Sequence, residues 1–191
     1  YFTVADNASP IVAIGTDPEL SSGTLRISYK YTPQPSEANL TLAGQKENLC
    51  RQMVISMLSY RLYDQATAGN NPQGLTLRFS DGDYSLAMTK KAMSAHANFK
   101  EDNWMQAMSA LVFQLKRAME HGFTLAEFER VCNDLRRSIS MTEENIGTAL
   151  PNNTLVQKCM AHFLHSHPLL SQAEEMKLYR QLLQGLTLAD V

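Results

Sequence analysis

Hydrophobic and polar residues alternate with a period of two over residues 24–31, where Leu25, Ile27 and Tyr29 are separated by polar side chains. This period predicts a β-strand with one buried face. A shorter apolar and β-branched run at residues 10–14 predicts another strand before it. Turn-forming residues lie between the two runs, so we expect two strands at the start of the chain.

A second pair of strands is expected later in the chain. Residues 75–79 are apolar at alternate positions and lead into Asp81-Gly82, a dipeptide that favours tight hairpins. The expected return strand is residues 84–88. Beyond Lys91 the apolar phase shifts by one residue, which implies a bulge or a break. The shifted positions are Met93, Ala95 and Ala97.

Between the strand pairs, apolar residues recur every three or four positions, as in an amphipathic helix. The helix is expected to begin between Glu37 and Gly44 and to end near Ala68. Its stripe consists of Leu49, Cys50, Met53, Val54, Met57, Leu58 and Leu62.

The second half of the chain is predicted to be helical. Asp102 or Asn103 is expected to be the N-cap of the first helix, and Gly122 to end it. Capping boxes at Thr124/Glu127 and Ser171/Glu174 predict two further helix starts, and Pro151 predicts another between them. The apolar stripes are Trp104, Met108, Leu111, Leu115 and Ala118 in the first of these helices, and Leu155, Val156, Cys159, Met160 and Phe163 in the one after Pro151. Grouped strands and helices predict an α+β fold, with a mixed or antiparallel sheet and helices packed on one face.

Thr187 and Asp190 resemble a third capping box, and the sequence ends within the first turn that follows. The first residue is Tyr1 rather than Met. We therefore expect residues 1–191 to be a single domain excised from a longer protein and truncated at its C-terminal helix.

Composition excludes several classes of protein. Hydrophobic residues make up 44% and charged residues 19% of the chain, and the net charge is −2. This balance is that of a globular protein and argues against nucleic-acid binding, and no apolar run is long enough to span a membrane. The dispersed Cys50, Cys132 and Cys159 do not form a disulfide framework, and we expect them to be buried. The bacterial cytoplasm and the periplasm or cell envelope are both compatible with these features.

Three histidines could carry chemistry. His162, His165 and His167 lie within one short run, and the first two could share a helix face and bind a metal. The run also lies where a helix ends before Pro168, where histidines complement the helix dipole. We favour this capping role and assign no metal ligands. No catalytic Ser, Cys or His arrangement is signalled by sequence spacing, so no catalytic residue is assigned.

Other chemistry-bearing side chains have simpler interpretations. Met53, Met57, Met105, Met108 and Met119 are expected to fill the core. Basic residues on the later helices are interleaved with acids and read as solvated surface. Arg61 is expected to be a surface residue paired with Asp64, unless a neighbouring domain covers it.

Four motifs, in order along the chain, resemble the non-catalytic repeat domain of the pitrilysin/insulinase family of zinc metallopeptidases, which includes the mitochondrial-processing-peptidase-like proteins. They are Thr16-Asp17-Pro18-Glu19-Leu20 ahead of Ile27-Ser28-Tyr29-Lys30, then Met57-Leu58-Ser59-Tyr60-Arg61-Leu62, then His121-Gly122-Phe123-Thr124 through Arg130, and finally Leu186 to Val191.

The resemblance implies repeated α+β domains that enclose peptide substrates in a chamber. It also implies a zinc held by H-x-x-E-H and a distal Glu in a separate catalytic domain, where the Glu of that motif activates the zinc-bound water. This sequence has no H-x-x-E-H, so it resembles a partner domain and contains no cofactor of its own. The family's substrate-binding Arg corresponds to Arg61. The Tyr expected seven residues later is Ala68 here, and this difference favours the second repeat.

The expected function is therefore structural: a chamber domain of a zinc metalloendopeptidase, inactive as an isolated fragment. Its partners would be sister domains or a paired subunit, together with the peptide substrate of the whole protease. Two alternatives remain open. One is a non-peptidase scaffold subunit of the same family, and the other is a small metal-binding domain that uses His162, His165 and His167.

Overall fold

The computed structural model describes residues 3–65, 75–82, 89–100, 103–147 and 150–191. Its contacts divide the chain into two compact units. Residues 1–33 and 55–122 form the first, which contains the sheet, and residues 34–54 and 123–191 form the second, which is helical. The prediction of a single domain over residues 1–191 stays a prediction, and each unit is described by itself below.

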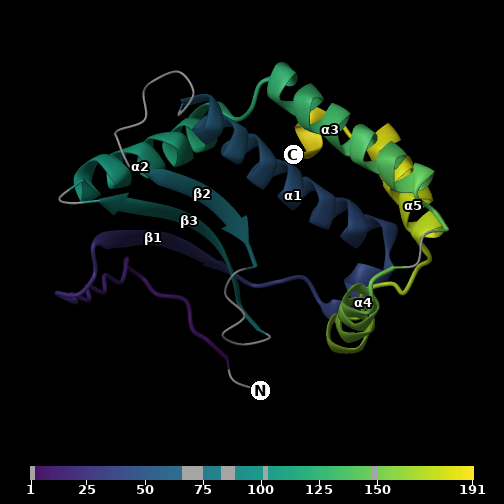
Figure 1. Cartoon of the computed structure of the whole chain (residues 1–191), viewed down its shortest axis with the longest axis horizontal. Helices are drawn as coiled ribbons and strands as arrows, with labels where there is room; N and C mark the ends of the chain where they lie inside the picture. Colours follow the sequence, from purple (N-terminus) through teal and green to yellow (C-terminus); the bar gives the residue numbers. More distant parts are fainter. Residues whose placement is uncertain (1–2, 66–74, 83–88, 101–102, 148–149) are drawn as a thin grey trace. The chain divides into compact units, whose positions relative to one another are not determined.

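The sheet has three antiparallel strands in the order β1-β3-β2 (Figure 1). They are β1 (Ser22–Tyr31), β2 (Thr76–Asp81) and β3 (Lys91–Lys100). The alternation predicted for residues 24–31 is confirmed at Leu25 and Ile27, which are half-buried between exposed Arg26 and Ser28, but Tyr29 is 49% exposed, so its predicted burial is wrong. The strand predicted at residues 10–14 is wrong. That segment is not in a strand, and Ile11, Val12 and Ile14 are each more than three-quarters exposed.

The consecutive strands β2 and β3 pair antiparallel, but the predicted turn at Asp81-Gly82 is wrong, because both residues face β3 residues. Asp81 lies opposite Met93, and the Gly82 amide donates to the carbonyl of Ala92. The partner of β2 is therefore β3, which starts at Lys91. The predicted return strand at residues 84–88 lies outside the described residues. Ala95 and Ala97 are buried on one face of β3, but Ala92 and Ser94 on its other face are buried too. The phase shift is measured from residues 84–88, so it stays a prediction.

The long helix is confirmed as α1 (Leu42–Gln65), preceded by the short 3-10 helix η1 (Ser36–Leu40). Most of its predicted stripe is buried: Leu49, Met53, Met57, Leu58 and Leu62 are each at most 5% exposed. Gly44 in its first turn fits closely against η1, since a Cβ placed there would lie 2.1 Å from the carbonyl oxygen of Ala38.

In the sheet unit, α2 (Trp104–His121) packs against β3 and β1. Leu111 and Leu115 are buried as predicted, and the positive φ of Gly122 ends the helix. Asn103 is its N-cap residue, while Asp102 lies outside the described residues. The core role predicted for Met105, Met108 and Met119 is wrong, because these side chains are 40–80% exposed.

The helical unit contains α3 (Leu125–Glu144), α4 (Asn152–His165), α5 (Gln172–Gln184) and the 3-10 helix η3 (Leu188–Asp190). All three predicted capping boxes are present, at the starts of α3, α5 and η3. The predicted α+β class is confirmed. Among the cysteines, Cys132 is buried and Cys50 half-buried, but Cys159 on α4 is exposed, so its predicted burial is wrong. No helix in the described ranges is long and apolar enough to cross a membrane.

Candidate functional site

Arg61 is the one residue that the sequence nominates for substrate binding. It lies near the end of α1 and is only 6% exposed, so its predicted place on the surface is wrong. Its guanidinium donates to the carbonyl of Gly122 at 2.7 Å. A buried charge needs such partners, because an unsatisfied cation would cost several kcal/mol.

This contact gives Arg61 a positioning role within the sheet unit, since it ties α1 to the residue that ends α2. The family's Tyr position, Ala68, lies outside the described residues. A substrate-binding role for Arg61 stays a prediction.

The three histidines lie at the C-terminal end of α4, as the capping interpretation predicts. Ser166 adopts a left-handed conformation with φ of 53°, and its amide donates to the carbonyl of His162. The Nδ1 of His162 lies 2.7 Å from the carbonyl oxygen of His167, so Nδ1 carries the proton in this contact. His165 and His167 pack edge to face, with ring centroids 6.4 Å apart.

These side chains do not form a metal centre. Within the described ranges, no three His, Cys, Asp or Glu side chains are placed to hold an ion. No set of side chains in these ranges therefore fits the zinc of the resembling family, and the expectation that the chain contains no cofactor stays a prediction. Cys50 and Cys132 do not offer an activated nucleophile either, because burial raises the pKa of both thiols.

A buried polar hub in the helical unit is centred on Asn39, in η1, which the sequence did not single out. The amide nitrogen of the Asn39 side chain donates to the carbonyl of His165 at 2.8 Å, and its side-chain oxygen accepts from Asn48. Gln45 donates to the backbone oxygen of Asn39. The hub thus joins η1, α1 and the end of α4, and no hydrophobic pattern could have indicated it.

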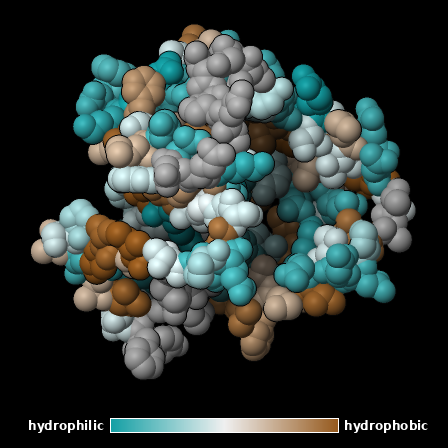
Figure 2. Space-filling view, turned by 60° about the vertical axis from the view of Figure 1, so that its left-hand side comes forward, coloured by the Kyte–Doolittle hydropathy of each residue, from teal (hydrophilic) through white to brown (hydrophobic). Residues whose placement is uncertain are grey.

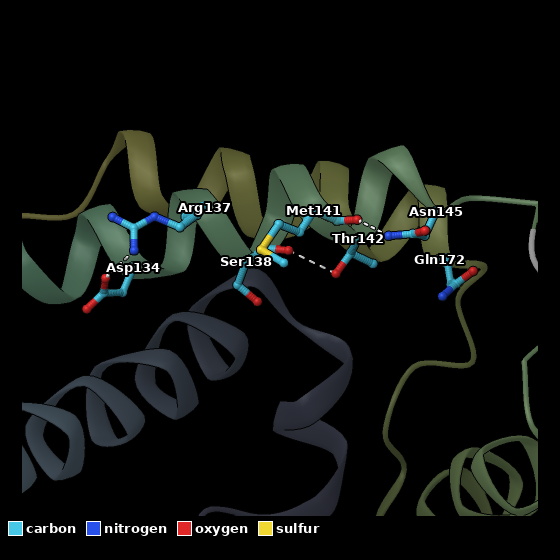
Figure 3. Close-up of a pocket in the computed structure, with 7 residues that line it drawn as sticks. All are labelled: Asp134, Arg137, Ser138, Met141, Thr142, Asn145 and Gln172. Carbon is cyan, nitrogen blue, oxygen red and sulfur yellow. Dashed lines mark hydrogen bonds and ion pairs between the residues drawn. The ribbon is translucent and has the colours of Figure 1, made fainter.

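A shallow hollow of about 550 Å³ lies along α3, and Figure 3 shows the seven residues that line it. All but two belong to α3, while Asn145 is the C-cap of that helix and Gln172 begins α5. Asp134 pairs with Arg137 at 3.6 Å, and Thr142 and Asn145 donate to carbonyls of α3. These groups are engaged along α3, so the hollow assembles no acid–base pair that could act on a ligand.

Apolar side chains are also exposed, as the brown residues among teal ones in Figure 2 show. The helix α4 has no buried residue at all. Its apolar residues Val156, Met160 and Phe163 are 55%, 47% and 86% exposed and follow helical spacing. Contiguous exposed apolar surface is typical of protein interfaces, membrane contacts and ligand grooves.

The fold is that of a domain of insulinase-family proteases. A structure described as a predicted insulinase family protease from Yersinia pestis matches 91% of this chain with a TM-score of 0.73 and 17% identity. The first half of the periplasmic protease PqqL from Escherichia coli matches 87% with a TM-score of 0.68 and 18% identity. The ferredoxin protease FusC, solved as a point mutant in complex with Arabidopsis ferredoxin, matches 92% with a TM-score of 0.65 and 15% identity.

The predicted resemblance to the pitrilysin/insulinase family is confirmed at the level of the fold. This chain spans 36% of the Yersinia structure, 34% of the PqqL half and 19% of FusC, so the matched proteins are much longer. No protein-family model and no curated protein matches this sequence.

Proposed function

We propose that this chain is a non-catalytic domain of a zinc-dependent metalloendopeptidase, which packs beside the zinc domain and forms part of the wall of the substrate chamber. The proposal rests on one observation: the chain has the fold of these proteases but lacks their zinc-binding motif. The structural likeness to insulinase-family proteases covers nearly the whole chain, yet the sequence contains no H-x-x-E-H. Zinc and the catalytic groups would belong to a sister domain or a paired subunit.

The unpartnered face of α4 supports a packing role. A helix that buries none of its own apolar residues gains stability from a surface that covers them. Val156, Met160 and Phe163 therefore offer a contact for the neighbouring domain.

Peptide cleavage tests the absence of catalysis in this chain. The purified 191 residues are incubated with a mixed fluorogenic peptide library, with added zinc and with a chelator. We expect no chelator-sensitive cleavage. Robust cleavage that zinc restores after chelation would overturn the proposal.

A second experiment separates the peptidase from the scaffold alternative. It determines whether the polypeptide that carries this chain, or a subunit that co-purifies with it, contains an H-x-x-E-H domain. Such a domain is expected, together with zinc and peptidase activity in the assembled protein. An assembled protein that lacks the motif and activity would instead be a scaffold.

The role of Arg61 is tested separately. If Arg61 has a positioning role, Arg61→Met lowers the unfolding midpoint of the chain. The folded variant then binds peptide with the same affinity as the original chain. Arg61→Lys retains the charge but loses the planar guanidinium, so it serves as the matched variant. A loss of peptide affinity at unchanged stability would favour the substrate-binding role.

A further inference from the structure

One face of the three-stranded sheet is polar at every position of three successive cross-strand rows. The register places Thr24, Asn98 and Thr76 in one row, Arg26, His96 and Arg78 in the next, and Ser28, Ser94 and Ser80 in the third. Because side chains alternate between faces, the rows between them lie on the opposite face, and these are Leu25, Ala97 and Leu77, and Ile27, Ala95 and Phe79. The middle row is entirely basic, and none of the three rows contains a carboxylate.

Side chains on this face hydrogen-bond to one another in two groups. The guanidinium of Arg26 donates to the hydroxyl oxygens of Ser28 and Ser94, both at 3.1 Å. These two hydroxyls lie 3.0 Å apart, and Ser80 lies 3.1 Å from the Nε2 of His96. Ser94 is fully buried at the centre, whereas Arg26, Ser28 and Asn98 are exposed. The two serine hydroxyls therefore hold the Arg26 guanidinium at the surface of the sheet, and Arg78 is exposed in the same cross-strand row.

The chain already places one carboxylate at the end of this face. Lys30 in β1 has the same parity as Arg26, and Lys90, directly before β3, has the same parity as Ser94. The Nζ of Lys90 contacts both carboxylate oxygens of Asp6, at 2.9 and 3.0 Å, and Lys30 donates to the carbonyl of Ala5. The ion pair with Lys90 lowers the pKa of Asp6. Irregular backbone with an acidic side chain thus fits against the end of the face.

We propose that the polar face formed by Arg26, Arg78, His96 and the three serines binds an extended peptide segment that carries acidic side chains. Guanidinium groups pair with carboxylates through charge-assisted hydrogen bonds, and alternate side chains of an extended peptide point towards the same face. None of the three rows has an aromatic side chain of Phe, Tyr or Trp on which bases could stack, which favours a peptide over single-stranded nucleic acid. The choice of a peptide rests on the proposed function, since a chamber wall would meet peptide substrates.

Fluorescence anisotropy of labelled peptides tests the inference on the full chain. The probe alternates Glu and Ser over about ten residues, roughly the length of a strand. Peptides in which Gln or Lys replaces each Glu are the controls, and a single-stranded oligonucleotide is a competitor. We expect the Glu peptide to bind at least about tenfold more tightly than the Gln peptide, and its affinity to fall between about 50 and about 200 mM salt.

The matched variants assign this binding to the sheet. The double variant Arg26→Gln/Arg78→Gln is expected to lose most of the preference for Glu over Gln. The variant Arg136→Gln/Arg137→Gln removes the same charge from exposed positions on α3 and should bind within about twofold of the original chain. Circular dichroism establishes that each variant is folded. If the Gln variant unfolds, Arg26→Lys/Arg78→Lys replaces it, with weaker binding expected from the loss of bidentate geometry.

Several results would overturn the inference. They are equal affinity for the Glu and Gln peptides, equal losses in the sheet and α3 variants, and an oligonucleotide that binds as tightly as the Glu peptide. None of these results bears on whether the chain cleaves peptides or belongs to a zinc protease. The proposed function is therefore tested independently, by the cleavage and co-purification experiments above.

Discussion

The helices α1 and α4 have similar sequence patterns and different surroundings. Each has an apolar stripe at spacings of three and four, including methionine and cysteine. In α1 the stripe is buried, and Met53 and Met57 have no exposed surface. In α4 no residue is buried, and Phe163 is 86% exposed. An apolar stripe therefore predicts that a helix forms, but it does not predict what covers the stripe.

The most direct test compares one methionine from each helix, both in the helical unit. Met53→Ala removes a fully buried side chain, and we expect the free energy of unfolding to fall by about 3 kcal/mol. Met160→Ala removes a side chain that is 47% exposed, with an expected change of less than about 0.5 kcal/mol. Urea unfolding followed by circular dichroism measures both, and equal losses would contradict the contrast between the helices.

The close fit of α1 against η1 gives the next largest effect. Gly44→Ala places a Cβ against the carbonyl oxygen of Ala38, a backbone atom that yields only if η1 moves. Although alanine is the better helix former, we expect a net loss of about 2 kcal/mol. Gly185→Ala is the matched control, because a Cβ there meets no atom within 4 Å and should change stability by less than about 0.5 kcal/mol. Equal unfolding midpoints for both variants would show that the fit is loose.

The Asn39 hub attaches the end of α4 by polar contacts instead of apolar ones. Asn39→Ala leaves the carbonyl of His165 and the amide of Asn48 without this partner, and the expected loss is about 1.5 kcal/mol. Amide hydrogen exchange should report faster opening at the C-terminal turn of α4 than in the middle of α3. Asn133→Ala, at an exposed site on α3, is the control, and it should leave exchange in α4 unchanged. Unchanged exchange in α4 in the Asn39 variant would show that other contacts hold this helix.

The smallest expected effect concerns Asp190 in η3, which forms an ion pair with Lys46 of α1. Lys46 and the capping hydrogen bonds of Thr187 lower the pKa of Asp190 to about 2. A lowered pKa contributes stability above the ordinary value of 3.8, and this contribution is lost as pH falls from about 4 towards 2. In the Asp190→Asn variant, the urea midpoint should therefore fall less between about pH 4 and about pH 2 than in the original chain. The loss of stability caused by Met53→Ala should be the same with and without Asp190→Asn. An identical decline in the variant would place the acid sensitivity elsewhere.

Local signals were the best guides to this structure. Thr124/Glu127 and Ser171/Glu174 predicted helix starts correctly because a capping box satisfies amides only three residues away. The β1 alternation and the α1 stripe were equally reliable, since both arise from one buried face. The failures were non-local. Residues 10–14 have strand-like composition but pair with no strand among the described residues, and Asp81 at the end of β2 lies opposite Met93 in β3.

The candidate sites show the same contrast between local signals and long-range contacts. The sequence indicated that His162, His165 and His167 end a helix, and it singled out Arg61. It gave no sign that Arg61 is buried against Gly122, or that Asn39 joins three elements, because these contacts connect residues far apart in the chain. The polar face of the sheet was also hidden. Its residues come from three separate strands, and only the register brings Arg26, His96 and Arg78 into one row.

By itself, the sequence determined the local elements, their caps, the α+β class and the absence of H-x-x-E-H, because each depends on neighbours a few residues apart or on residue identity alone. The tertiary structure decided which apolar stripes are covered, which polar residues are buried and which strands pair. These outcomes depend on the free energy of contacts between distant segments, and no local pattern encodes the partner in such a contact.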